Sequence, residues 1–214
     1  MSKDNYFRGT NIKERWEEKH IQQYHLDKPF DFTAFENEDM SGYGPVAAKI
    51  LEENKEGFHR KSLHEMGCGN GDFAAYIKQS VLKDWEVSAE DFSEVAINSA
   101  KSKEPNVDYF TNDFLLNRLD TDYGCICMFE TIEHIEEGTN YEMLDNILNH
   151  CEYAVVSTVD TEDDCFGEHI SHYKIDTFEK NGYDVVWKSF LGEINMPDGI
   201  YHYMIFLIRG NLNE

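Results

Sequence analysis

The segment 64–73, HEMGCGNGDF, places three glycines at alternate positions directly after a short apolar run. Glycine weakens both helices and strands, so three glycines this close together indicate a turn with a special steric requirement. The run before the turn predicts a strand, and residues 72–82 after it predict a helix. A strand, a glycine-rich turn and a helix in this order place a ligand over the carboxyl end of the strand.

Strands and helices alternate along the rest of the chain, which predicts crossover connections and a mostly parallel sheet. We expect an α/β, Rossmann-like sheet of seven strands with helices on both faces and an antiparallel last strand pair, joined by a hairpin at Pro197, Asp198 and Gly199. The predicted strands are 61–66, 85–91, 107–110, 124–130, 153–159, 183–191 and 201–210, and the later helices are 93–101, 141–149 and 175–181.

The length of 214 residues suits one compact unit. We expect residues 1–58 to form a helical extension that shapes the acceptor side, with Tyr43 lining the pocket and Trp16 packing as an ordinary helix residue. Residues 59–214 form the main domain.

The charge balance bears on partners. There are 42 acidic residues against 19 Lys and Arg, a formal net charge of −23. Such a surface repels phosphate backbones and anionic lipid, so neither nucleic acid nor a membrane is expected as the main partner. The five cysteines are odd in number, and Cys125 and Cys127 alternate within an apolar run, which predicts buried thiols rather than a disulfide framework. The first residues are polar, without the apolar core of a signal peptide, so we expect a cytoplasmic protein.

Carboxylates flank the glycine turn and indicate what it binds. The turn reads Gly-Cys-Gly-Asn-Gly over 67–71 rather than G-x-G-x-x-G, a spacing that disfavours a pyrophosphate. Glu65, just before the turn, would repel a phosphate and attract an ammonium group. Asp91 ends the second predicted strand, where a carboxylate accepts hydrogen bonds from ribose hydroxyls. The pattern therefore predicts a pocket for a positively charged nucleoside.

Four ordered segments resemble the motifs of the class I S-adenosylmethionine (SAM)-dependent methyltransferases. They are EMGCGNG (65–71), AEDFSEVAINSAK (89–101), TNDF (111–114) and MFETIEHIEE (128–137). The resemblance extends from about residue 60 to the carboxyl terminus. It implies SAM as cofactor, a transferase activity, and cofactor-binding roles for Glu65, Gly67, Cys68, Gly69, Asp91, Phe92, Asn112, Asp113, Phe114, Phe129 and Glu130.

Within that resemblance, Gly67 and Gly69 would allow close approach of the cofactor, while Glu65 would hold its amino acid end. Asp91 would bind the ribose, and Asp113 would meet the adenine amino group. Phe92 would cover one face of the adenine, although core packing explains that phenylalanine equally well.

Catalytic candidates follow the fourth and fifth predicted strands. Glu133 and His134 lie after the fourth, and His169 lies after the fifth, so both loops open on the edge that carries the glycines. Histidine titrates near neutrality and suits a base. In many relatives the Glu-His pair only fixes loops. We predict Glu133, His134 and His169 as catalytic residues and assign no metal ligand.

Three functions are compatible with these residues. The first is O-methylation of a small molecule, which we take as the main prediction. The second is a metal-dependent RNA 3′-end 2′-O-methyltransferase, because Glu130, Glu133, His134 and His172 resemble the E-x-x-E-H and distant His of that family. The sequence departs from the family in its acidity and in the residues after His172. The third is a cofactor-binding scaffold without catalysis.

Overall fold

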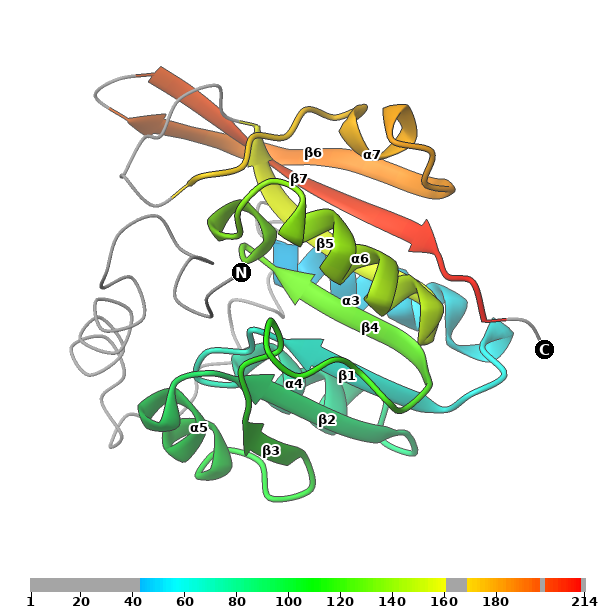
Figure 1. The fold of residues 1–214 in the computed structure, drawn as a ribbon. Coiled ribbons are helices and arrows are strands. Elements are labelled where there is room, and N and C mark those ends of the chain that lie inside the picture. Colours follow the sequence, from blue (N-terminus) through cyan, green and yellow to red (C-terminus); the bar gives the residue numbers. More distant parts are fainter. Residues whose placement is uncertain (1–42, 161–168, 197–198, 213–214) are drawn as a thin grey trace.

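The computed structural model describes residues 43–160, 169–196 and 199–212. It contains a seven-stranded sheet in the order β3-β2-β1-β4-β5-β7-β6 (Figure 1). The first five strands are parallel, and β7 runs antiparallel to both β5 and β6. The bounds are β1 Ser62–Met66, β2 Glu86–Asp91, β3 Asp108–Thr111, β4 Tyr123–Phe129, β5 Cys151–Asp160, β6 Val185–Met196 and β7 Gly199–Arg209.

This topology confirms the predicted α/β fold with its antiparallel last strand pair. The predicted hairpin residues Pro197 and Asp198, and also Trp16, lie outside the described residues.

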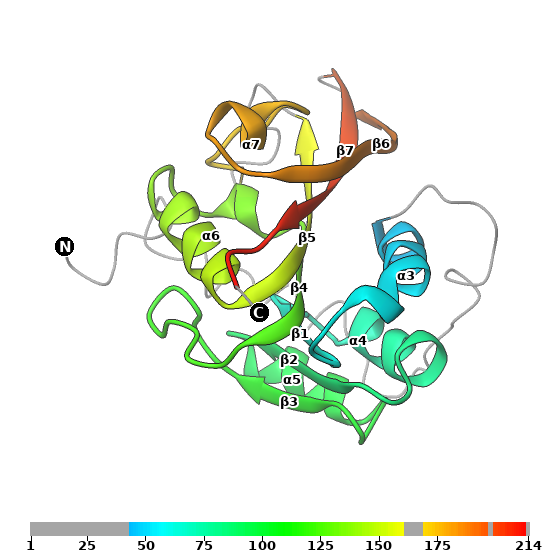
Figure 2. The same ribbon diagram turned by 90° about the vertical axis from the view of Figure 1, so that its right-hand side faces the viewer.

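Helices cover both faces of the sheet (Figure 2). The helices α3 (Tyr43–Asn54), α4 (Asp72–Tyr76) and α5 (Glu94–Lys101) pack on one face, and α6 (Thr139–Asn149) and α7 (Thr177–Lys180) pack on the other. Strand β4 shows why both faces are apolar. Cys125, Cys127 and Phe129 enter the first core, while Ile126 and Met128 enter the second, as the two-residue period of a strand requires.

The strand register brings three chain turns to one edge. Met66, the last residue of β1, pairs with Glu90 of β2 on one side and with Met128 of β4 on the other. The glycine turn after Met66 therefore lies between the ends of β2 and β4. This is the carboxyl edge of the parallel strands, where α/β sheets bind ligands.

The helix bounds match the prediction approximately, and the largest difference follows β1. The segment predicted as one helix over 72–82 is α4 followed by a π-helical turn, Ile77–Val81. The Leu82 amide donates to the Ile77 carbonyl at 2.8 Å, five residues back, which is the π pattern. The predicted Ser93 cap of α5 is confirmed, since its Oγ accepts from the Ala96 amide at 3.2 Å.

Buried thiols were predicted for Cys125 and Cys127, and both are fully buried. Within the described ranges, no helix has the length and apolar character that a membrane crossing demands.

Candidate functional site

The glycine turn has a left-handed backbone at each of its three glycines. Gly67, Gly69 and Gly71 have φ angles of 72°, 52° and 73°, which residues other than glycine adopt only at a cost. A Cβ on Gly67 would lie 2.6 Å from Thr131 Oγ1, and one on Gly71 would lie 2.7 Å from the Tyr109 ring. These two glycines are therefore required by the protein's own packing as well as by the turn.

Asp91 holds the glycine turn from the end of β2. Its two carboxylate oxygens accept hydrogen bonds from the Gly69 amide at 2.9 Å and from the Ser93 amide at 2.8 Å. The residue is 4 % exposed. These bonds hold the carboxylate at the carboxyl edge of the sheet, where an acid can accept hydrogen bonds from ribose hydroxyls.

Glu65 belongs to β1, and its side chain reaches the first turn of α4. Its carboxylate accepts from the Ala74 amide at 3.1 Å. Burial raises the pKa of Glu65 to about 8, and the nearby acids Asp72 and Asp91 add to the increase. A cation close to this carboxyl would lower that pKa again, because an opposite charge favours the ionised form.

The residues predicted to meet the adenine follow β2 and β3. The side-chain amide of Asn112 donates to the Glu90 carboxylate at 2.8 Å, so this amide stabilises the turn after β3. Asp113 accepts from the Leu115 amide at 3.2 Å. Phe114 packs against the core that α6 covers, whereas Phe92 is partly exposed.

Aromatic side chains support the strand end from the α3 side. Phe129 stacks on Tyr43, with ring centroids 5.0 Å apart, and meets the edge of Phe73 at 4.7 Å. Tyr43 is partly buried here, which is compatible with its predicted place at the pocket wall. Cys68 is buried in the adjoining core, and its amide donates to the Glu90 carbonyl at 2.9 Å.

Glu130 occupies a strained backbone position at the end of β4. Its φ of 47° is the single positive value outside glycine in the described part of the chain, and such strain is concentrated at functional sites. Its carboxylate accepts from Ser157 Oγ at 2.7 Å. Burial raises the pKa of Glu130 to about 7.

Glu133 lies in a short 3₁₀ turn, Ile132–His134, directly after β4. The residue is 1 % exposed. Its Oε2 accepts from Thr158 Oγ1 at 3.0 Å, whereas Oε1 finds no hydrogen-bond partner among the residues that the structure describes. Burial, together with the charge of Glu130, holds the pKa of Glu133 well above its usual range.

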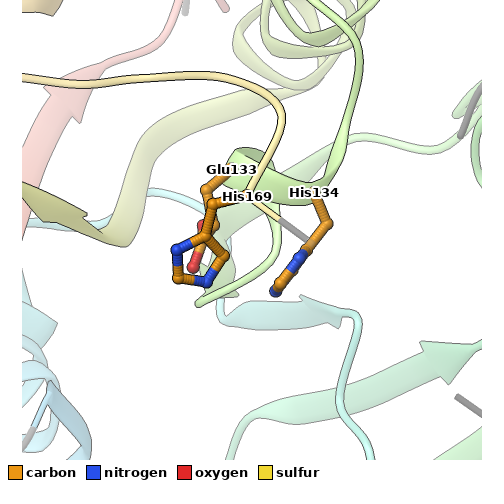
Figure 3. Close-up of side chains that lie close together, drawn as sticks. All are labelled: Glu133, His134 and His169. Carbon is orange, nitrogen blue, oxygen red and sulfur yellow. The ribbon is translucent and has the colours of Figure 1, made fainter. Parts of the chain in front are cut away.

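His134 and His169 meet beside this carboxylate. Their ring centroids are 5.0 Å apart with an interplanar angle of 58°. One ligand atom from each of Glu133, His134 and His169 lies within 4.8 Å of the others. Figure 3 shows the Glu133 carboxylate beside the His169 ring, with the His134 ring facing them. The structure thus brings together the three predicted catalytic residues from two loops that are distant in the sequence, as their shared sheet edge implied.

The alternative metal set is not assembled in this way. His172 is exposed and lies outside the group of Glu133, His134 and His169. Sequence reasoning also missed three hydroxyl residues that support the site, Thr131, Ser157 and Thr158. The signal available for the last two was a pair of polar residues at the end of the apolar β5 run, where a polar side chain needs a buried partner.

A family model matches part of the chain. Residues 64–153 match the family model described as a methyltransferase domain. A search of curated proteins gave no match.

Solved structures share the fold at low identity. The magnesium protoporphyrin IX methyltransferase of Synechocystis PCC 6803, with bound SAH, is 13 % identical at a TM-score of 0.61, with 94 % of this chain and 96 % of that chain covered. A TehB-like SAM-dependent methyltransferase of Corynebacterium glutamicum is 15 % identical at 0.60, with 92 % and 100 % covered. The N-methyltransferase NodS of Bradyrhizobium japonicum WM9 is 15 % identical at 0.61, with 78 % and 96 % covered. The first name gives a porphyrin as acceptor and the third gives a nitrogen atom, so the shared fold leaves the acceptor of this chain open.

Proposed function

We propose that this chain is a class I SAM-dependent methyltransferase and that it transfers the methyl group to an oxygen atom of a small molecule. The observation that carries the proposal is the group of Glu133, His134 and His169, whose ligand atoms lie within 4.8 Å of one another at the carboxyl edge of the sheet. A hydroxyl acceptor of high pKa needs help to release its proton, and this group offers that help.

The residues on the cofactor side fit SAM. The left-handed turn at Gly69 leaves a bare backbone beside the Asp91 carboxylate, which suits a ribose. Glu65 supplies a second acid below the turn, which suits the ammonium of the amino acid end. When bound, SAM supplies an electrophilic methyl group on a positively charged sulfur. Neither Asp91 nor Glu65 takes part in bond making; both bind and orient.

The residues on the acceptor side align the acceptor oxygen and help it to lose its proton. Methyl transfer is an in-line displacement, so much of the rate comes from alignment of the acceptor with the methyl carbon. The acceptor hydroxyl gives its proton to a base, its oxygen forms the new C–O bond, and the C–S bond breaks with its electron pair going to sulfur. In this proposal His134 or His169 receives that proton directly or assists its loss.

The first residues of the chain complete the proposal. We infer that residues 1–58 act as the extension that closes the acceptor side, and that 59–214 form the catalytic domain. Support comes from α3, which lies on the methyltransferase core through Leu51 and stacks Tyr43 on Phe129 at the end of β4.

Charge argues against RNA as the acceptor. A formal net charge of −23 opposes a phosphate backbone. Resemblance to the RNA 3′-end enzymes leads one to expect His172 beside Glu133 and His134, but His172 is exposed and lies outside the group of Glu133, His134 and His169.

The test measures SAH formation from SAM with two acceptor panels. One panel holds small phenols, catechols, hydroxy acids and sugars, and the other holds short single-stranded RNA with a free 3′ end. We expect turnover with a member of the first panel and a large loss of kcat in Glu133→Gln and His169→Ala. Turnover with RNA alone would contradict the proposal. SAM binding without turnover on any acceptor would favour the scaffold alternative.

A further inference from the structure

Three nitrogen and oxygen donors of the type that bind transition metals converge at the end of β4. Glu133 offers a carboxylate, and His134 and His169 each offer an imidazole nitrogen, all within 4.8 Å of one another (Figure 3). Two imidazoles and one carboxylate are a common donor set for a divalent metal with open coordination positions. Donor atoms at that spacing are close enough to share one ion at about 2.0–2.2 Å from each after small side-chain adjustments.

One of these donors has an oxygen available for a ligand. Glu133 is 1 % exposed, and its Oε1 has no hydrogen-bond partner within the described ranges. A buried carboxylate oxygen without a donor is costly, so proteins keep one where a ligand satisfies it. The other oxygen, Oε2, is fixed by Thr158 Oγ1 at 3.0 Å. The carboxylate is therefore oriented by one oxygen and left open at the other.

The backbone joins the two loops that carry the donors. The amides of Ile170 and Ser171 both donate to the Glu133 carbonyl, at 2.9 Å and 3.0 Å. These bonds place the residue before Ile170, which is His169, against the turn that carries Glu133 and His134. His172, which is exposed, follows Ile170 and Ser171 in the chain.

A buried polar network also holds the side chain of Ser171 in place. Ser171 Oγ donates to the Ile135 carbonyl at 2.5 Å. Asn140, at the start of α6, donates to Ser171 Oγ at 3.1 Å and to the Tyr173 hydroxyl at 2.5 Å. Asn140, Ser171 and Tyr173 are all buried. Outer contacts of this kind fix the orientation of metal ligands, so the donors converge on a rigid base.

We propose that Glu133, His134 and His169 bind one divalent transition-metal ion, with zinc, cobalt and manganese as the class of ion and with His172 outside the ligand set. Two imidazole ligands favour these ions over magnesium and calcium, which prefer oxygen ligands. The three ligands leave positions open for the acceptor oxygen.

The consequence for catalysis rests on the proposed function. A divalent metal held by Glu133, His134 and His169 would make an acceptor hydroxyl more acidic, so the hydroxyl would lose its proton to a solvent base more readily than a free hydroxyl does. Glu133 and the two imidazoles would hold the metal, and the deprotonated acceptor oxygen would attack the methyl carbon.

The experiment titrates cobalt(II) into the full chain after dialysis against chelator. We expect visible d–d absorption that saturates at one cobalt per chain, is displaced by zinc and is unaffected by magnesium. His134→Ala and His169→Ala should each weaken cobalt binding by at least about tenfold, and Glu133→Gln should do the same. His172→Ala is the matched control and should bind as the wild type does. Thermal unfolding of each variant separates loss of the site from loss of the fold.

Two outcomes would overturn the proposal. Absence of a saturable cobalt spectrum in folded wild type would do so, as would a loss of binding in His172→Ala that His169→Ala does not share. SAH formation measured on the same samples separates this result from the proposed function. Acceptor turnover without a metal site would support the proposed methyltransferase function and overturn the metal site. A metal site without turnover on any acceptor would support the metal site and contradict the proposed function.

Discussion

The buried acid under the glycine turn gives a stability prediction that can be worked out in numbers. Glu65→Gln keeps the shape of the side chain and its acceptor for the Ala74 amide, 3.1 Å away in the wild type, but removes the ionisable group. Burial raises the pKa of Glu65 from 4.5 to about 8 in the folded protein. The unfolded chain, in which this group is exposed to water, releases the proton near the ordinary value.

The direction in which stability changes with pH follows from proton binding. Between the two pKa values the folded wild type holds a proton on Glu65 that the unfolded chain has lost, so its stability falls as the pH rises through this window. One pH unit corresponds to about 1.4 kcal/mol, so the full window amounts to at most about 5 kcal/mol. The variant carries no such proton. Relative to the wild type, Glu65→Gln should therefore gain stability steadily from pH 5 to pH 8.

Urea unfolding at a series of pH values measures this difference. The wild type and Glu65→Gln should have similar unfolding free energies near pH 5, and the variant should be the more stable by several kcal/mol at pH 8, as an order of magnitude. Glu86→Gln, at an exposed strand position, gives the baseline for removal of one surface carboxylate. Parallel stability curves for the wild type and Glu65→Gln would refute the reasoning, because they would mean that Glu65 titrates alike in the folded and unfolded chains.

Three further substitutions test the packing and the hydrogen bonds around the site. Gly71→Ala places a methyl group on a backbone with φ of 73°, 2.7 Å from a tyrosine ring, and should cost about 2–4 kcal/mol in urea unfolding; a loss under about 1 kcal/mol would contradict the close packing of the turn against that ring. Tyr173→Phe removes the hydroxyl that accepts from Asn140 and should lower the free energy of unfolding by about 1–2 kcal/mol, as measured by the same method; an unchanged value would show that this network is not needed. Thr158→Val removes the hydroxyl that donates to Oε2 of Glu133 and should weaken cobalt binding about 10–100-fold, with unaltered cobalt affinity as the contrary result.

Most of the fold could be predicted because its strands carry local signals. Buried parallel strands such as β4 read as unbroken apolar runs, and the capping serine of α5 is visible in the sequence. The π turn after α4 could not be predicted, since it depends on which carbonyl the Leu82 amide selects in the packed structure. Local patterns do not encode that choice.

The candidate site could likewise be predicted only in part. Glu133 and His134 follow a recognisable strand, so their place at the carboxyl edge could be predicted. The catalytic prediction named His169, whereas the metal alternative named His172. Spacing alone could not decide between the two, because the choice depends on loop amides that donate to the Glu133 carbonyl. Thr158 was missed for a similar reason, since its role exists only where β5 passes Glu133.

Calorimetric titration of SAM is the most direct test of the cofactor site on which the proposed activity depends. We predict saturable binding to the wild type at one SAM per chain. Asp91→Asn, which alters the carboxylate that holds the Gly69 amide, should bind at least about tenfold more weakly, while His172→Ala should bind as the wild type does. If the folded wild type binds no SAM, or if Asp91→Asn binds it with unchanged affinity, the glycine turn and Asp91 do not form the cofactor site described here.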